Sequence, residues 1–248
     1  MIEIAAADGT AEAYIAGNEG AGQRPGVLLF IDAFGLRPQI EQMVDRIASW
    51  GYVVMAPNVF YRSGTAAELA PKADLRLPGE RERFFATATP RMQDLTSERA
   101  RRDIGAYIDA LRSLPAVAES GIAVTGYCMG ARLATYAAGD HPDDVVAAGG
   151  FHGGRLVTDA ADSPHLTLTQ ARAAFVFGHA DKDRSMPLEA VDALGETLRA
   201  HGLTASNEVY ADASHGYTMA DTSAYDEAAA ERHYTELKAL LDRTLAPR

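Results

Sequence analysis

The sequence is poor in cysteine and in basic residues. Cys128 is the one cysteine among 248 residues. A single thiol cannot form an internal disulfide or a zinc site made of several thiolates, so disulfide scaffolds and zinc fingers are excluded. The chain has 23 Lys and Arg residues against 34 Asp and Glu residues, a formal net charge of −11. This balance repels phosphate backbones and anionic lipid, so we expect neither a nucleic-acid partner nor a membrane partner.

Long hydrophobic runs are also missing. The longest strongly apolar runs, such as residues 27–31, are far shorter than the roughly 20 residues that span a bilayer. The N-terminus has no basic stretch followed by an apolar one, which predicts that there is no secretory signal and that the protein is cytoplasmic. In that compartment Cys128 is reduced, and it is either a small buried side chain or a reactive group.

Short β-type runs alternate with helical stretches along nearly the whole chain. Apolar runs separated by helices are typical of a mostly parallel sheet with helices on both faces, an α/β fold. We expect strands at 12–16, 27–31, 52–57, 122–125, 145–151, 173–177 and 207–210, and helices at 38–50, 97–114, 131–138, 187–201 and 224–245. No repeat, low-complexity tract or linker divides residues 1–248, which predicts one domain.

The regular pattern is lost at 63–90, where prolines, glycines and scattered charges follow one another. We expect an irregular excursion there. Its length is more typical of a lid or a pocket wall than of a simple connection.

The motif Gly126-Tyr127-Cys128-Met129-Gly130 lies between an expected strand and an expected helix. It has the form Gly-x-nucleophile-x-Gly of a nucleophile elbow, a strained turn whose flanking positions must lack side chains. The thiol would project beside a helix N-terminus, where partial positive charge favours thiolate. The amide of Met129 would be placed to donate to a developing oxyanion.

An acid and a histidine follow in the order typical of α/β-hydrolases. Asp181 and Asp183 lie in the loop after the expected strand 173–177, and His215 follows the last expected strand. Loops at the carboxyl ends of parallel strands meet at one edge of the sheet, where such folds bind ligands. Asp181 comes sooner after its strand and is the preferred acid, with Asp183 as the alternative.

A second histidine, His152, follows the expected strand 145–151 and faces the same edge of the sheet. It would either contact substrate or support the loops around it. No pair of histidines is spaced with an acid as metal ligands are, so we expect no metal site.

Together these residues resemble the dienelactone hydrolases, cysteine members of the α/β-hydrolase fold. The elbow, the later aspartate and the motif Ser214-His215-Gly216 carry the resemblance, with residues 31–35 and 51–57 in support. It covers most of the chain, from Val27 to the final helix. It implies hydrolysis of a lactone or ester by a Cys-His-Asp triad, without a cofactor.

The resemblance also implies roles for the segment after the early strand. The backbone of Ala33 would supply the second oxyanion donor. Asp32 stands where well-studied members have a glutamate that helps to control the thiol, so Asp32 would either control the thiol or order its loop.

The chain departs from the family at the residue that holds a substrate carboxylate. Members place an arginine four residues after the histidine, and this chain has Met219 there. Arg62, Arg81 and Arg37 are candidate replacements, with Arg62 preferred. His152, Phe34 and Tyr127 are the other expected substrate contacts.

The function hypothesis is therefore acyl transfer to Cys128 through a thioacyl-enzyme, on a small-molecule ester or lactone. A general carboxylesterase or thioesterase could use the same triad on another acyl group. A non-catalytic α/β-hydrolase binding module is the alternative from a different class, although it predicts a loss of triad residues. We expect a monomer or a small homo-oligomer.

Overall fold

An eight-stranded sheet runs through the computed structural model, which describes residues 1–20 and 22–245. The strand order is β1-β2-β4-β3-β5-β6-β7-β8. The hairpin β1–β2 and the pair β2–β4 are antiparallel, and the other neighbours are parallel. The strands are β1 (Ile2–Ala6), β2 (Gly9–Ala16), β3 (Gly26–Phe30), β4 (Val53–Pro57), β5 (Ile122–Tyr127), β6 (Val145–Phe151), β7 (Ala174–Ala180) and β8 (Ala205–Tyr210).

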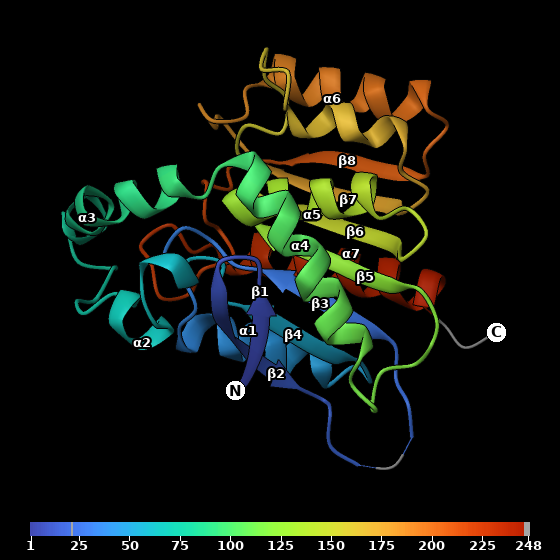
Figure 1. The fold of residues 1–248 in the computed structure, drawn as a ribbon. Helices are drawn as coiled ribbons and strands as arrows, with labels where there is room; N and C mark the ends of the chain where they lie inside the picture. Colours follow the sequence, from blue (N-terminus) through green and yellow to red (C-terminus); the bar gives the residue numbers. More distant parts are fainter. Residues whose placement is uncertain (21, 246–248) are drawn as a thin grey trace.

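Helices cover both faces of this sheet (Figure 1). The helices are α1 (Pro38–Ala48), α2 (Ala66–Leu69), α3 (Glu80–Asp94), α4 (Ser97–Arg112), α5 (Met129–Asp140), α6 (Leu188–Ala200) and α7 (Glu227–Leu245). Helices α4 and α5 pack together against the central strands, while α1 and α7 contact strands of the same sheet from the opposite face. Among the described residues, no helix combines the length and the apolar character needed to cross a bilayer.

The central strands are buried at every residue, as expected for a sheet covered on both faces. All residues of β3, β4 and β5 are buried. Such strands show no alternation of polar and apolar residues, and their continuous apolar runs made them recognisable in the sequence. The predicted α/β-hydrolase architecture is confirmed.

Two parts of the N-terminal third differ from expectation. The strand expected at 12–16 is the second half of a hairpin whose first strand, β1, was not predicted. The region 63–90 is not irregular throughout, because it contains α2 and most of α3. Helix α3 buries only Ala88 and Arg91 and includes Pro90, so it lacks the apolar periodicity by which a helix is recognised.

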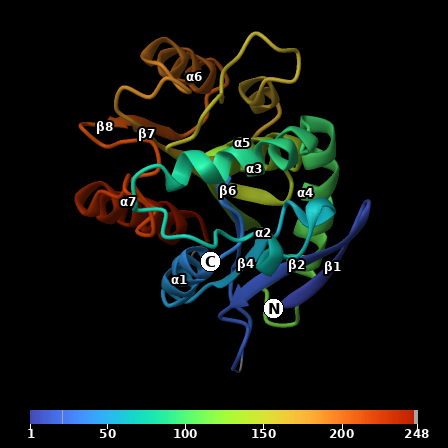
Figure 2. The same cartoon turned by 90° about the vertical axis from the view of Figure 1, so that its left-hand side faces the viewer.

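Helices α2 and α3 project at one end of the sheet (Figure 1). Figure 2 faces this end and shows α3 lying across it. Strands β3, β5, β6, β7 and β8 run parallel, so the loops that follow them gather at the same edge. These loops carry the candidate site.

Candidate active site

Cys128 occupies a sharp turn between β5 and α5. Its φ of 55° is positive, a backbone conformation that residues other than glycine seldom adopt. A Cβ at Gly126 would lie 2.0 Å from the Gly130 carbonyl oxygen, and one at Gly130 would lie 2.3 Å from the Phe30 oxygen. Both flanking positions therefore require glycine, as the elbow motif predicts.

The Cys128 sulfur lies beside a histidine that is bound to a carboxylate. His215 Nε2 is 3.0 Å from Cys128 Sγ, and His215 Nδ1 is 2.6 Å from Asp183 Oδ2. Burial alone would lower the pKa of His215, but the neighbouring Cys128 sulfur and the Asp183 carboxylate raise it to about 10. An imidazole with that pKa is protonated at neutral pH, the state that pairs with a thiolate.

The carboxylate on His215 belongs to Asp183, so the preference for Asp181 is wrong. Strand β7 continues to Ala180, beyond the end expected at residue 177, and places Asp181 at the strand end. There the Asp181 amide donates to the Ala213 oxygen, and its carboxylate accepts from the Asp212 amide. Lys182, with a φ of 52°, turns the chain and brings Asp183 to His215.

Asp183 is held in place by more than His215. Its Oδ1 accepts hydrogen bonds from the Ser185 amide at 2.8 Å and from the Ser185 hydroxyl at 2.7 Å. Burial opposes ionisation, but the bonds from His215 and Ser185 lower the pKa of Asp183 below its ordinary value. The carboxylate is therefore ionised at neutral pH and can orient the ring of His215.

Two backbone amides are free to donate near the elbow. Within residues 1–20 and 22–245, neither the Met129 amide nor the Ala33 amide has a hydrogen-bond acceptor. Met129 is the first residue of α5, where helix amides have no partner within the helix. Gly130 packs against the Phe30 and Ile31 carbonyls, so the elbow and the start of the segment that carries Ala33 lie side by side.

Asp32 is engaged with an arginine. Its Oδ1 accepts from Arg37 Nη1 at 2.7 Å and from the Phe34 amide at 3.0 Å, while Oδ2 accepts from Arg37 Nη2 at 3.1 Å. Asp32 has no hydrogen bond to Cys128 in the described part of the chain. Of the two expected roles, these contacts favour ordering of the loop.

His152 is a buried residue that packs against His215. It is completely buried, its Nε2 is 2.7 Å from the Thr218 hydroxyl, and its ring centroid is 5.4 Å from that of His215. Burial, together with His215 nearby, holds the pKa of His152 well below its usual range, so the ring is neutral. A ring without exposed surface packs against His215, which corresponds to the supporting role and contradicts the substrate contact.

Two further expected substrate contacts are wrong. Tyr127 is fully buried, and its hydroxyl lies 3.1 Å from His233 Nε2. Its side chain points into the core because the elbow turns only Cys128 outward. Arg62 is bound to the buried Asp103, at 2.6 Å, and to Asp8, and its guanidinium is thereby neutralised.

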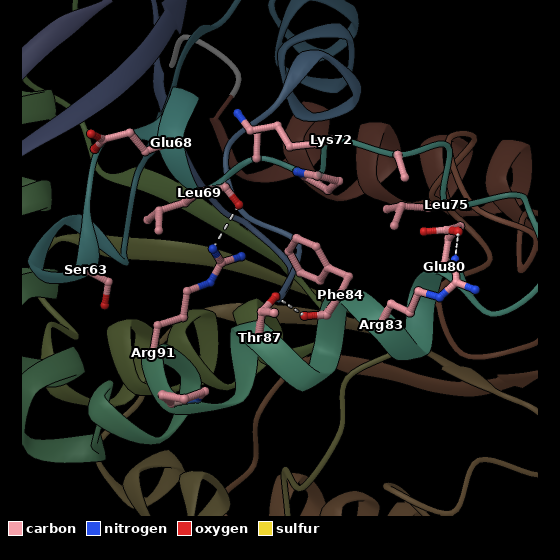
Figure 3. Close-up of a pocket in the computed structure, with 14 residues that line it drawn as sticks. Ser63, Glu68, Leu69, Lys72, Leu75, Glu80, Arg83, Phe84, Thr87 and Arg91 are labelled. Atoms are coloured by element: carbon pink, nitrogen blue, oxygen red, sulfur yellow. Dashed lines mark hydrogen bonds and ion pairs between the residues drawn. The ribbon is translucent and has the colours of Figure 1, made fainter.

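Helix α3 contacts Phe34 and includes Arg91, an arginine that the sequence did not suggest. Phe34 packs against the rings of Phe84 and Phe85, with centroids 5.2 and 5.0 Å away. Arg91 donates to the Ala33 and Phe34 carbonyls and also lines a pocket between α2 and α3 (Figure 3). The region 63–90 thus forms a pocket wall. Arg91 was missed because nothing in the sequence signals that α3 folds back over residues 32–35.

The comparisons with known proteins agree with this geometry. The model of the dienelactone hydrolase family matches residues 11–245. The chain belongs to the dienelactone hydrolase family. The match spans almost all described residues, from β2 to the end of α7, and includes every loop of the site.

Individual relatives are distant but extensive. A Methylorubrum extorquens protein with a provisional assignment as a carboxymethylenebutenolidase is 24% identical over 220 residues, 87% of this chain and 71% of the relative. A Salmonella typhi protein with the same provisional assignment is 28% identical over 214 residues, 85% of this chain and 74% of the relative. The crystal structure of a Klebsiella pneumoniae protein, provisionally a dienelactone hydrolase, superposes with a TM-score of 0.81 at 22% identity, covering 97% of this chain and 96% of the other. The family member described here is accordingly a hydrolase of ester or lactone bonds.

Proposed function

We propose that this enzyme cleaves a carboxylic ester or lactone through a thioacyl-enzyme formed on Cys128. The observation that carries the proposal is the chain of contacts from Cys128 through His215 to Asp183, with distances of 3.0 and 2.6 Å. A nucleophile, a base and a group that orients the base are the parts that covalent acyl transfer requires.

The first half-reaction forms the thioester. The Cys128 thiolate adds to the substrate carbonyl carbon, and the negative charge that develops on the carbonyl oxygen is stabilised by the amides of Met129 and Ala33. When the tetrahedral adduct collapses, the carbon–oxygen bond to the alcohol portion breaks. The proton on His215 Nε2 passes to the departing oxygen.

The second half-reaction releases the acid. His215, now neutral, takes a proton from a water molecule while that water attacks the thioester carbonyl. The carbon–sulfur bond then breaks, and the thiolate is restored beside the protonated His215. Throughout both steps Asp183 holds Nδ1 of the ring and favours its charged form.

Intact-mass measurement tests this proposal. The wild type is mixed briefly with p-nitrophenyl acetate, an acyl thioester and an unsaturated γ-lactone that carries a carboxylate. We expect a mass increase equal to the acyl group with at least one of them, and neither adduct nor turnover in Cys128→Ala. Turnover that persists in Cys128→Ala would overturn the assignment of the nucleophile.

One observation favours neutral esters over a carboxylate-bearing lactone. Met219, at the position where the family has an arginine, is buried against Arg37, and the guanidinium of Arg37 is bound to Asp32 and Asp221. Neither residue offers a free cation to a substrate carboxylate. The same panel separates the two substrate classes by kcat/KM.

A further inference from the structure

Residues 32–35, which we call the 32–35 loop, carry the proposed oxyanion donor Ala33. The loop follows β3 without forming a helix or strand of its own. A donor on such a segment stabilises the transition state only if the segment is already held in place before the reaction. The contacts of the loop show how it is held.

Two buried arginines from different elements bind the loop. Arg37 precedes α1 and binds the Asp32 carboxylate with two nitrogens, and its Nη1 also donates to the Gly35 carbonyl at 3.1 Å. Arg91, from α3, donates through Nη2 to the carbonyls of Ala33 and Phe34 at 3.2 and 3.3 Å. The exposed fractions of the two arginines are 4% and 9%.

Hydrogen bonds engage most of the backbone carbonyls and amides of the loop. The Asp32 carbonyl accepts from the Gly35 amide at 3.2 Å, so all four carbonyls of the loop accept hydrogen bonds. The amides of Phe34 and Gly35 donate within the loop. The amides of Asp32 and Ala33 have no acceptor among the described residues, and the Ala33 amide is the one proposed to donate to the oxyanion.

Arg37 also joins the loop to the segment that follows His215. It donates to both carboxylate oxygens of Asp221, at 2.6 and 3.0 Å, and its Nη2 is 3.5 Å from the Met219 sulfur. Burial alone would lower the pKa of Arg37, but Asp32 and Asp221 raise it, so the guanidinium stays charged. The Arg37 side chain therefore links the 32–35 loop to the segment that follows His215.

Arg91 has a different environment. Its Nη1 donates to the Leu69 carbonyl at 2.9 Å (Figure 3), and every hydrogen bond of its guanidinium in the described structure is to a backbone carbonyl. A charged group buried to this extent without a carboxylate costs stability. The guanidinium also stacks on the rings of Phe60 and Phe84, whose centroids are 4.8 and 5.0 Å away, and these cation–π contacts offset part of that cost.

We propose that Arg37 and Arg91 are positioning residues that lock the 32–35 loop with the Ala33 amide directed at the oxyanion. This inference rests on the proposed thioacyl chemistry. Neither arginine touches the reacting atoms, and each acts through the backbone that it holds.

The test compares ester turnover with alkylation of the same thiol. Displacement of iodide from iodoacetamide needs the thiolate but develops no oxyanion. In Arg91→Met we expect kcat on p-nitrophenyl acetate to fall by about 10- to 100-fold with KM nearly unchanged, as for a displaced oxyanion donor. The alkylation rate should stay within about threefold of wild type, and Arg91→Lys, which can still donate, should recover part of the loss.

Matched variants separate positioning from general loosening. Met92→Ala weakens the packing of α3 on the core but leaves the donors of Arg91 and the Phe84 ring in place, so it should retain most of the turnover. Arg37→Lys keeps the charge but loses the bidentate bond to Asp32, so it should reduce kcat. Arg62 is also paired with two carboxylates, those of Asp103 and Asp8, and Arg62→Lys should leave kcat unchanged. Thermal melting confirms that each variant is folded.

Three results would overturn the inference: unchanged kcat in Arg91→Met, a parallel loss of alkylation, or an equal loss in Met92→Ala. Each leaves the proposed function intact, provided that Cys128→Ala is inactive. Turnover by Cys128→Ala would instead remove the proposed function itself, so the two failures are distinguishable.

Discussion

Asp183 binds His215 and Ser185 at once, whereas Asp181 is fixed to the backbone of the neighbouring loop. The two aspartates are separated by a single residue, so they form a matched pair for substitution. On the proposed mechanism Asp183 orients His215, while Asp181 joins two loops.

We expect Asp183→Asn to lower kcat by about 10²-fold or more, because an amide cannot stabilise the imidazolium and favours the wrong tautomer of His215. Asp181→Asn should keep kcat within about threefold, since the carboxylate contacts the Asp212 amide and the exposed Lys182 rather than His215. Steady-state hydrolysis of p-nitrophenyl acetate by both variants provides the measurement. A larger loss in Asp181→Asn would restore the acid that the sequence favoured.

The raised pKa of His215, about 10, predicts the pH dependence of thiol reactivity. Below that pH the ring keeps its proton and can pair with a thiolate, and the pairing is lost as the pH rises through 10. Alkylation by iodoacetamide at neutral pH should therefore be faster in the wild type than in a variant that cannot carry a proton at residue 215, because the charged ring stabilises a thiolate 3.0 Å away. A free thiol, with an ordinary pKa near 8.5, loses roughly 10²-fold in rate between pH 8 and pH 6.

His215→Gln provides the comparison, because glutamine cannot carry the proton. We expect its alkylation rate to follow the free-thiol profile, with a steep fall between pH 8 and pH 6. Identical profiles for the variant and the wild type would show that no ion pair exists between Cys128 and His215.

At the scale of elements, the turn from β5 to α5 depends on the close approach of two backbones. A Cβ at Gly130 would lie 2.3 Å from the Phe30 oxygen and 2.6 Å from the Ile31 oxygen, and backbone cannot move aside as a side chain can. We expect Gly130→Ala to lower the free energy of unfolding by about 2–3 kcal/mol. Activity should fall as well, because the 32–35 loop follows directly.

Gly105 in α4 is the control for this substitution. A Cβ there would meet only the His141 ring, at 3.6 Å, an ordinary contact. Alanine is favoured over glycine within a helix, so Gly105→Ala should raise the free energy of unfolding by up to about 1 kcal/mol. Urea unfolding of both variants checks the pair, and a stabilising effect of Gly130→Ala would contradict the packing argument.

The elements that could be predicted from the sequence are those with a strong local pattern. Buried parallel strands are continuous apolar runs, and the elbow needs its two glycines for reasons confined to five residues. Helix α3 has no such pattern, because its contacts with the 32–35 loop come from Arg91 and from the neighbouring rings of Phe84 and Phe85 rather than from a regularly spaced apolar stripe. The choice between Asp181 and Asp183 depended on where β7 ends, which pairing with β8 decides.

The pocket residues were the least predictable part of the site. Cys128 and His215 follow from motif and order, but the partners of an arginine depend on segments far apart in the chain. Arg37 forms an ion pair with Asp221, and Arg62 forms ion pairs with Asp103 and Asp8. No local sequence pattern predicts these contacts. The order of strands predicts which loops lie at the same edge of the sheet. The packing between those loops decides which charged side chains have no ion-pair partner.

At the scale of the whole molecule, the formal net charge of −11 acts on every substrate that approaches. The ion pairs of Arg37 with Asp32 and Asp221 neutralise a cation that could otherwise offset this charge near the site. We therefore expect repulsion of an anionic lactone, whereas a neutral ester carries no charge on which the net charge of the protein can act. Salt screens such repulsion over a Debye length of about 10 Å at 0.1 M.

The dependence of kcat/KM on ionic strength should accordingly separate the two substrate classes. Between about 10 mM and 150 mM salt, we expect kcat/KM to rise severalfold for the carboxylate-bearing lactone and to stay constant for p-nitrophenyl acetate. The neutral ester controls for effects of salt on the chemistry itself. A fall in kcat/KM for the lactone would mean that a local cation outweighs the acidic envelope. Arg184, exposed at the hollow beside His215, would then be the first residue to substitute, and the preference for neutral esters would be wrong.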